Sequence, residues 1–269
     1  MPELPDVEGF RRLLERHGAG RRVCAVDVRD AGVLHGLSSR RFAESVSGRC
    51  FASPRRHGKW LLAPLDSPGR GGEAGPTIIW HFGMTGSLEW APKKTTEHHP
   101  HDRIVLDLDR GQLAYRDQRK LQGVWFAADS DEADRIIGPQ GPDALGISKA
   151  ELAEHVGSRR GGLKAALMDQ HVIAGVGNLL ADEVLWRARL YPGRRAGKLS
   201  NDELQRLHRC LQQVLRTSIP HGRIPTAEGW LTGVRDQPDA RCPRSGHPLS
   251  DGRVDGRRTR WCPGCQPQQ

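Results

Sequence analysis

Long apolar runs are missing from this chain. No stretch of about 18 consecutive apolar residues occurs in it, so we expect no membrane-spanning helix. The first residues are charged and polar, unlike the apolar core of a secretory signal, so we expect no signal peptide and a cytoplasmic protein. The sequence also has no internal repeat and no long low-complexity tract.

Cysteine is scarce as well, with six residues in the chain. The isolated three are Cys24, Cys50 and Cys210, and the three near the C-terminal end are Cys242, Cys262 and Cys265. We interpret the isolated ones as reduced, partly buried thiols. A cytosolic protein with a metal site explains the terminal group better than disulfides do.

Acidic residues are outnumbered by basic ones. The chain has 32 Asp and Glu against 41 Lys and Arg, a formal net charge of +9. This excess indicates a polyanionic partner but says nothing about the fold. The length of 269 residues is enough for two domains and a sizeable core.

The first half of the chain reads as one helix followed by strands. Pro5 stands at the first turn of a predicted helix, in which Val7, Phe10 and Leu14 recur at helical spacing. Short segments rich in β-formers then alternate with Gly, Pro and Asp, which predicts a β-sandwich or barrel of about 100 residues. The predicted strands are 23–28, 60–63, 77–80, 104–108 and 112–115, with Arg110-Gly111 as a hairpin turn and 67–76 as a Gly-rich mobile loop.

The second half reads as helical. Residues 138–142, rich in Gly and Pro, form the predicted linker. The predicted helices after it are 149–156, 163–170, 178–187 and 201–217. Ser200 and Glu203 have the spacing of a capping box for the last helix, and Trp230-Leu231 is a predicted packing anchor in the aperiodic stretch 218–240.

The start of the chain carries candidate chemistry. Pro2 follows the initiator Met, and a small second residue lets that Met be trimmed, which leaves a free secondary amine. An α-amino group has a pKa of about 7.7–8.0, so much of it is unprotonated near neutrality. Such an amine can attack an aldehyde-like carbon and form a Schiff base, with Glu3 as a proton carrier beside it. Read alone, the same residues also make an ordinary helix entry.

Several motifs follow in order along the chain. They are 54–60 with Lys59, 81–88 with Met84, 117–123 with Arg119 and Leu121, 164–178 with Lys164 and Asn178, and the Arg-rich, Cys-bearing tail with Arg257. Gly83 and Gly86 allow a tight loop that lifts Met84. Gly175 and Gly177 predict two tight turns before a helix that Asn178 can cap, and the free amides of that helix start can bind a phosphate.

Together these features resemble the formamidopyrimidine-DNA glycosylase / endonuclease VIII family of base-excision repair enzymes. The resemblance begins with the opening Pro2-Glu3-Leu4-Pro5-Asp6-Val7-Glu8, where Asp6 stands in place of the usual Glu, and extends over nearly the whole chain. It implies an α+β multi-domain fold. The expected parts are an N-terminal β-sandwich with a leading helix (1–130), a helix–two-turn–helix domain (131–225) and a zinc-ribbon-like β-hairpin with its preceding loop (226–269).

The resemblance also implies roles for single residues. Pro2 attacks the sugar C1′, Glu3 handles protons, and Lys59 contacts the phosphate at the lesion. Met84 fills the gap left by the flipped base, Arg119 bonds to the orphaned base, and Leu121 stands where the family has an aromatic wedge. Asp182 and Glu183, which match an acidic pair of the family, are interpreted as structural. The residues implied to hold DNA phosphates are Lys164, Asn178 and Arg257.

The terminal hairpin departs from the family's zinc ribbon, because Ser245 replaces one cysteine of the first Cys-x-x-Cys. A neutral hydroxyl is a poor zinc ligand, whereas structural zinc takes four thiolates or imidazoles. His247 lies two residues further on, so we predict one structural zinc held by Cys242, His247, Cys262 and Cys265. A metal-free hairpin held by packing is the alternative.

We therefore expect a monomeric, nucleoid-associated bifunctional DNA glycosylase and AP lyase, which acts on double-stranded damaged DNA and cuts it by β,δ-elimination. Oxidised purines, formamidopyrimidine and 8-oxoguanine, are the expected lesions, because of the Pro2-Glu3-Leu4-Pro5 opening. Two alternatives stay open: an endonuclease VIII-like enzyme for oxidised pyrimidines, and a catalytically silent protein that binds damaged DNA. Retention of Pro2, Glu3 and Lys59 argues against the second.

Overall fold

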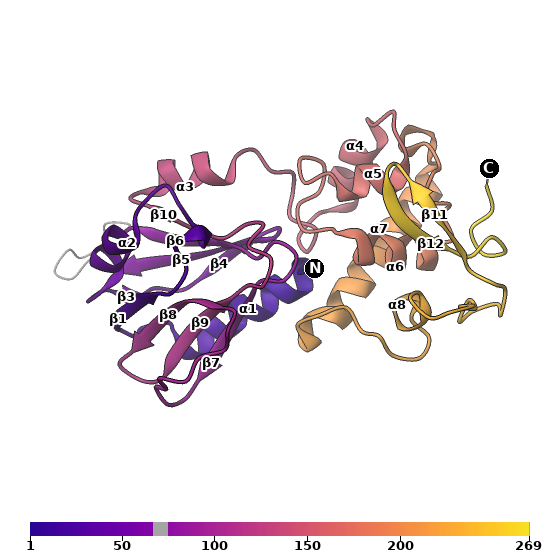
Figure 1. Cartoon of the computed structure of the whole chain (residues 1–269). Coiled ribbons are helices and arrows are strands. Elements are labelled where there is room, and N and C mark those ends of the chain that lie inside the picture. The colour runs from indigo at the N-terminus through magenta and orange to yellow at the C-terminus, as the bar shows by residue number, and fades with distance from the viewer. Residues whose placement is uncertain (67–74, 269) are drawn as a thin grey trace. The chain divides into compact units, whose positions relative to one another are not determined.

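A computed structural model describes residues 1–66 and 75–268 of the chain (Figure 1). The predicted loop 67–76 lies almost wholly outside the described residues. The chain forms two compact units, one made of Met1–Pro2 and Val7–Pro139, the other of Glu3–Asp6 and Gln140–Gln269. Among the described helices, none combines the length and the apolar character that a membrane crossing requires.

The leading helix, α1 (Leu4–His17), begins where the sequence predicted. Its Val7 and Leu14 are buried in the first unit, while Phe10 packs on Phe82 with ring centroids 4.4 Å apart. Arg16 stands in its last turn, where a positive charge interacts favourably with the helix dipole. The helix is thus held by one apolar stripe against the first unit's core.

The first unit is a sandwich of two sheets. One sheet has the order β1-β8-β9-β7, and the other has the order β2-β10-β6-β5-β3 with β4 also paired to β5. All pairings are antiparallel except that of β2 with β10. The strands are β1 (Val23–Val28), β2 (Leu34–His35), β3 (Cys50–Phe51), β4 (Arg55–His57), β5 (Trp60–Asp66), β6 (Thr77–His81), β7 (Ser87–Ala91), β8 (Asp102–Leu108), β9 (Gln112–Arg116) and β10 (Val124–Ala127).

One apolar core lies between the two sheets. It joins Leu106 and Leu113 of the first sheet to Leu61 and Ile78 of the second, with Val7 of α1 packed among them. A core shared by both inner faces identifies a sandwich rather than a closed barrel. The sequence did not predict the short helices η1 (Ala31–Val33), α2 (Ser39–Val46) and α3 (Ser130–Ile137), nor the strands β2, β3, β4, β7 and β10.

The second unit begins with helices. They are α4 (Lys149–Gly157), α5 (Leu163–Met168), α6 (Asn178–Ala188), η2 (Ala196–Lys198), α7 (Asn201–Ser218), η3 (Ile219–His221) and α8 (Leu231–Val234). The predicted capping box of α7 is present, because the Ser200 hydroxyl accepts from the Glu203 amide and the Glu203 carboxylate from the Ser200 amide. Leu163, Leu185 and Leu207 from three of these helices share one apolar core.

A terminal hairpin, β11 (Ser250–Val254) and β12 (Arg257–Trp261), completes the second unit. Its cysteines Cys242 and Cys262 pack with Trp186 of α6 and Leu231 of α8 in a small apolar cluster. Leu231 is therefore the packing anchor that the sequence indicated. The hairpin belongs to the same unit as the helices, whereas the sequence had divided residues 131–269 into two domains.

Candidate catalytic residues and nucleic-acid interface

Glu3 is fully buried and closes the start of α6. Its carboxylate accepts hydrogen bonds from the backbone amides of Gly177 (2.9 Å), Leu179 (2.8 Å) and Leu180 (3.0 Å). The start of a helix favours negative charge because its first amides have no partner within the helix. The fold therefore holds the Glu3 side chain at a fixed place.

Two glycines make room for this contact. A β-carbon at Gly177 would lie 2.3 Å from the Glu3 carboxyl carbon, and one at Gly175 would lie 2.6 Å from the Leu4 side chain. Gly175 also has a φ of +107°, a conformation that other residues rarely adopt. The glycines predicted to make tight turns therefore serve the N-terminal segment as well.

The backbone of Glu3 is fixed too. Its amide donates to the Asp6 carboxylate at 2.9 Å, and the next amide, of Leu4, donates to the Gly175 carbonyl at 3.1 Å. Burial raises the pKa of Asp6 above its ordinary value. Asp6 stands where the family usually has Glu, and it still supplies the carboxylate that binds a free amide at the helix start.

These contacts correct one prediction about Asn178. The helix α6 has Gly177 as its N-cap, with no side-chain cap, and Asn178 is its first helical residue. Glu3, not a phosphate, takes three of the amides at this end. The side-chain oxygen of Asn178 is buried without a hydrogen-bond partner in the described part of the chain.

Lys59 lies in the first unit, in the two-residue turn between β4 and β5. Gly58 has a φ of +55°, which a turn of this kind requires. Lys59 is half-buried near His81. Burial, with the positive charge of Lys59 as a second cause, lowers the pKa of His81 to about 4. His81 is thus a neutral imidazole at neutral pH, and the sequence gave no sign of this pairing.

Hydrogen bonds tie the loop of Met84 to the loop of Arg119. The Thr85 hydroxyl donates to buried Asp117 at 2.5 Å, and the Arg119 amide donates to the Thr85 hydroxyl (3.0 Å) and to Asp117 (3.1 Å). Gly86 is required at the base of the Met84 loop, because a β-carbon there would lie 2.4 Å from the Phe82 carbonyl oxygen. The fold therefore brings two motifs together that are about 30 residues apart in sequence.

The side chains on these two tied loops project to the surface. Met84 is 39% exposed and Leu121 is 52% exposed, and Arg119 is exposed as well. Besides Met1, these two are the exposed large apolar side chains of the described residues, and both lie on the tied loops. Apolar groups gathered in one place at the surface are typical of a contact surface. Lys120, between Arg119 and Leu121, has a φ of +51°. Its ammonium pairs with Asp30 at 2.9 Å, which fixes the backbone of the loop.

The structure contradicts the predicted phosphate contact of Lys164. This side chain is 1% exposed, and its ammonium lies 2.7 Å from the Asp182 carboxylate, 2.8 Å from the Thr259 hydroxyl and 3.0 Å from the Arg258 carbonyl. An ammonium has three N–H groups, and three oxygen atoms already surround this one. Lys164 therefore ties the helical part of the unit to strand β12.

Asp182 is the centre of this buried cluster. It also pairs with Arg235 at 3.0 Å, and both residues are almost fully buried. Desolvation lowers the pKa of Lys164 and raises that of Asp182, while their mutual attraction opposes both shifts. Glu183 beside it accepts from Arg187 (2.8 Å) and from the Thr232 amide (3.1 Å). The acidic pair is structural, as the sequence indicated.

Arg257 lies at the tip of the terminal hairpin. Asp255 and Gly256 form its two-residue turn, with φ values of +49° and +75°, and Arg257 is the first residue of β12 after it. Positive φ at both positions is typical of the turn that matches strand twist. Arg257 is exposed and makes no ion pair within the described residues, so its guanidinium is available at the surface.

The three terminal cysteines form a compact group. The sulfur atoms of Cys242, Cys262 and Cys265 all lie within 4.8 Å of one another, and those of Cys242 and Cys265 are 3.8 Å apart. A tetrahedral zinc with Zn–S bonds of about 2.3 Å separates its sulfur ligands by about 3.8 Å. Burial raises the pKa of the Cys242 thiol, but hydrogen bonds from Ser245 and Trp186 lower it to about 6. Three ligands thus fit a zinc ion.

The predicted fourth ligand is corrected by the structure. His247 is exposed and lies outside the group of sulfur atoms; its ring covers Gly264, where a β-carbon would lie 3.2 Å from it. The Ser245 hydroxyl stands beside the sulfurs instead, 3.4 Å from Cys262. The chain from Cys242 makes a tight turn in which the Gly246 amide donates to the Cys242 carbonyl, and this turn carries Ser245 inward.

A β-sandwich with a leading helix, a helix–two-turn–helix unit that binds the N-terminal Glu3, and a cysteine-bearing hairpin define a DNA-repair class of protein. Residues 1–124 match the family model described as the formamidopyrimidine-DNA glycosylase N-terminal domain, and residues 139–228 match that of the formamidopyrimidine-DNA glycosylase H2TH domain. The chain belongs to the formamidopyrimidine-DNA glycosylase family.

Individual relatives agree with this membership. The chain is 35% identical to the formamidopyrimidine-DNA glycosylase of Desulfitobacterium hafniense, with 99% of this chain and 100% of the relative covered. It is 34% identical to the enzyme of the same name from Symbiobacterium thermophilum, with 99% and 90% covered. A Lactococcus lactis Fpg structure in complex with Fapy-dG-containing DNA shares the fold, with a TM-score of 0.85, 24% identity, and 99% and 100% of the chains covered.

Proposed function

We propose that this protein is a base-excision repair DNA glycosylase with AP lyase activity, in which Pro2 is the nucleophile. The observation that carries the proposal is the fixation of Glu3. Its carboxylate and its backbone amide are both hydrogen-bonded, so the residue that follows Pro2 is held rigidly. Once Met1 is removed, the Pro2 amine is therefore presented from a fixed point, which favours attack on a bound carbon atom.

The chemistry requires no cofactor for bond making. The lone pair of the Pro2 nitrogen forms a bond to the sugar C1′ while the bond from C1′ to the damaged base breaks, and the base leaves with that electron pair and a proton. Ring opening gives a Schiff base between Pro2 and C1′. Loss of a C2′ proton then expels the 3′ phosphate, and a second elimination expels the 5′ phosphate. Glu3 is the proton carrier closest in sequence, and Lys59 assists at the lesion phosphate.

Oxidised purines are the proposed lesions, in line with the names of the relatives. An alternative is kept for oxidised pyrimidines, because one Lactococcus lactis Fpg structure contains DNA with an oxidised pyrimidine. A panel of duplexes, each with one defined lesion, separates the two by single-turnover cutting rates. A preference for the pyrimidine lesions would favour the endonuclease VIII-like alternative.

DNA contacts are assigned to two groups of side chains. Met84, Arg119 and Leu121 occupy the tied loops of the first unit, and they are proposed to enter the space left by the flipped base. Refilling the stack is needed because unstacking a base costs a few kcal/mol. In the second unit, Asn178 and Arg257 are proposed to hold backbone phosphates. Lys164 is no longer in this set, because its ammonium is buried.

A structural zinc is proposed at the terminal hairpin, held by Cys242, Cys262 and Cys265. The distances among the three sulfurs support it. The Ser245 hydroxyl lies beside the fourth position but is a poor zinc ligand, so a water molecule is proposed to complete the site. The ion would fix the turn that packs against Trp186, and through it the hairpin that carries Arg257.

The variant Pro2→Gly tests the nucleophile. It should retain DNA binding and lose most strand cutting, because glycine lacks the secondary amine. The measurement is borohydride trapping, which crosslinks protein to DNA only through a Schiff base. A form that retains Met1 should fail to crosslink, because its Pro2 nitrogen is part of a peptide bond and is no longer a free amine. Trapping of either form at the wild-type rate would exclude Pro2 as the nucleophile. A wild-type protein that binds lesions but never crosslinks would instead be a catalytically silent binding protein.

A further inference from the structure

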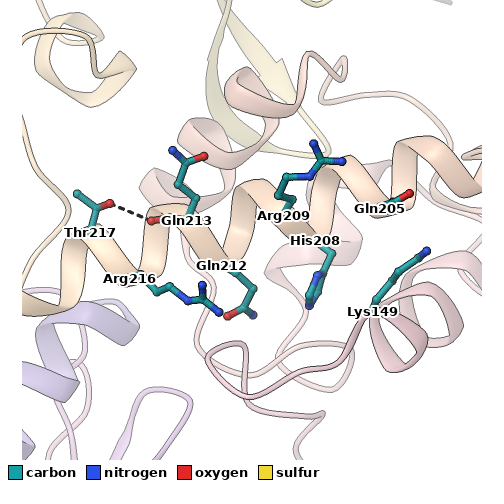
Figure 2. A pocket seen from close by; sticks show the side chains of 8 residues that line it. All are labelled: Lys149, Gln205, His208, Arg209, Gln212, Gln213, Arg216 and Thr217. Carbon is teal, nitrogen blue, oxygen red and sulfur yellow. Dashed lines mark hydrogen bonds between the residues drawn. The ribbon is translucent and has the colours of Figure 1, made fainter.

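Helix α7 carries a basic groove that the proposed activity does not use. The groove has a volume of about 510 Å³ and is lined by Lys149 of α4 together with Gln205, His208, Arg209, Gln212, Gln213, Arg216 and Thr217 of α7 (Figure 2). Figure 2 shows Arg216 toward one end of this row and Lys149 toward the other. None of the residues assigned to catalysis or lesion binding lines it.

The spacing of these residues makes a single stripe along the helix. Positions 205, 208, 209, 212, 213 and 216 recur every three or four residues, so they share one face of α7. Leu204, Leu207, Leu211 and Leu215 form the opposite, buried face. At 1.5 Å per residue the polar stripe extends over roughly 16 Å.

No side chain of the groove is acidic, and each one has a hydrogen-bond donor. The His208 ring, one amide hydrogen of Gln212 and the Thr217 hydroxyl already donate to backbone carbonyls. The donors left for a ligand are mainly those of Lys149, Gln205, Arg209, Gln213 and Arg216. The sequence has no Asp or Glu between Glu203 and Glu228. Lys149, Arg209 and Arg216 make no ion pair within the described residues, whereas Arg187 and Arg194 of the same unit pair with Glu183 and Glu203. The lining of the groove thus carries positive charge and no acidic side chain, and the acidic residues close to it in sequence include Glu151 and Glu154 of α4.

The groove is also rigid. The His208 ring nitrogen Nε2 donates to the Ile147 carbonyl at 3.0 Å, and the Gln212 amide donates to the Ala144 carbonyl at 3.0 Å. These bonds pin the segment before α4 to α7. Ser148 then caps α4 with a capping box, which fixes the helix start where Lys149 lies.

We infer that this groove binds the sugar-phosphate backbone of a second segment of duplex DNA, separate from the segment that carries the lesion. Phosphates are contacted by Arg and Lys together with neutral donors such as Gln, and the free donors of the stripe are of these two kinds. A stripe of roughly 16 Å is long enough to face several successive phosphates of one strand. The evenly spaced phosphates of a DNA strand fit this row of donors better than the carboxylates of an acidic peptide do.

The test keeps the lesion site filled. The wild-type protein is trapped with borohydride on a short lesion duplex, and a labelled, undamaged second duplex is titrated into the covalent complex. The complex should bind it with a Kd of about 10⁻⁴–10⁻⁶ M, the range of non-specific DNA binding. The triple variant Lys149→Gln, Arg209→Gln and Arg216→Gln should bind about tenfold more weakly, with a salt slope lower by about two to three.

A control variant distinguishes the effect of the groove residues from the effect of a lower net positive charge. Arg40→Gln, Arg41→Gln and Arg135→Gln remove the same charge from exposed positions of the first unit. This control should bind the second duplex like the wild type, and the groove variant should still cut the short lesion duplex at the wild-type rate. Absence of second-duplex binding, equal binding by the groove variant, or equal weakening by the control would each overturn the inference.

Failure of the proposed function has a different signature, because no crosslink would then form. In that case the lesion site is filled with an excess of unlabelled short lesion duplex. The same titration then shows whether the groove binds a second duplex.

Discussion

At the scale of single residues, the tertiary structure changes the meaning of several side chains that the sequence had singled out. Glu3 was predicted as a proton carrier, and it is also the cap of α6. Lys164 was predicted at the surface and is buried in an ion-pair cluster. His247 was predicted as a metal ligand and instead covers Gly264. In each case a partner distant in sequence decided the role.

His81 provides a pH-dependent prediction. Its pKa is about 4 in the folded protein, below the ordinary value of 6.5. Between these values the unfolded chain binds a proton that the folded chain does not, so this residue lowers the stability as pH falls from 6.5 to 4, by about 3 kcal/mol in all. The variant His81→Asn should show a flatter dependence of unfolding free energy on pH in this window. Denaturant unfolding at several pH values measures it.

The exposed His171 offers the matched control for that experiment. His171→Asn should keep the wild-type pH profile. If His81→Asn and His171→Asn gave the same profile, the low pKa of His81 would be wrong.

Leu121 provides a prediction about the wedge. Leu121→Phe should increase the preference for damaged over undamaged duplex, because a flat ring stacks on a base with about 1–3 kcal/mol per base. The backbone at this place is fixed by the contact between Lys120 and Asp30, so the new ring replaces the leucine without moving the loop. The ratio of the two dissociation constants measures the effect. An unchanged ratio would place Leu121 outside the base stack.

At the scale of elements, the terminal hairpin depends on α5 and α6 for its position. Lys164 of α5 bonds to the backbone of Arg258 and to Thr259 of β12, and Asp182 of α6 accepts from the Arg260 amide at 3.4 Å. Trp186 of α6 donates to Cys242 at 3.3 Å. The Arg257 at the hairpin tip is therefore presented by two helices, with the cysteine group as a second support.

Lys164→Met should destabilise the protein by about 3–5 kcal/mol, because it leaves the Asp182 charge buried with one partner fewer. It should also weaken DNA binding through the loss of the fixed hairpin. Chemical denaturation measures the first effect, with Lys198→Met at an exposed position as a control that changes stability by about 0.5 kcal/mol or less. If Lys164→Met lost as little stability as the control and also lowered the salt slope of DNA binding, Lys164 would again be assigned to a DNA phosphate.

The metal site yields a further prediction at this scale. Purified protein should contain about one zinc per chain, and His247→Ala should leave that content unchanged, because the imidazole lies away from the sulfurs. Ser245→Cys should slow the loss of zinc to a chelator, since it supplies a fourth thiolate at the right place. Loss of zinc in His247→Ala would reinstate the histidine as a ligand, and absence of zinc from the wild type would exclude the site.

At the scale of the whole molecule, an excess of positive charge is distributed over both compact units. The net charge of +9 agrees with a DNA partner, and the two units carry separate groups of proposed contact residues. Met84, Arg119 and Leu121 belong to the first unit, and Asn178 and Arg257 belong to the second. The α7 groove adds a third basic surface. Long-range attraction by such surfaces speeds the search for a damaged site.

Local patterns allowed the sequence by itself to determine much of this protein. Features that depend on neighbours a few residues away could be predicted. These are the Gly-bearing motifs, the alternating strands, the capping box at Ser200 and the clustered cysteines. They indicated the α+β fold and the family, while the role of Pro2 as nucleophile stays a prediction. Short elements such as β2, β3 and β10 were missed, because segments of two to four residues have too little period to be recognised.

Only the tertiary structure decided which side chains are buried and which atoms they meet. The ammonium of Lys164 is satisfied by residues about 20 and 95 positions away, and the carboxylate of Glu3 by amides more than 170 positions away. Ser245, not His247, stands beside the sulfurs because the direction of one tight turn selects it. Contacts of this kind depend on how the elements pack, and packing brings together residues whose separation in sequence carries no signal.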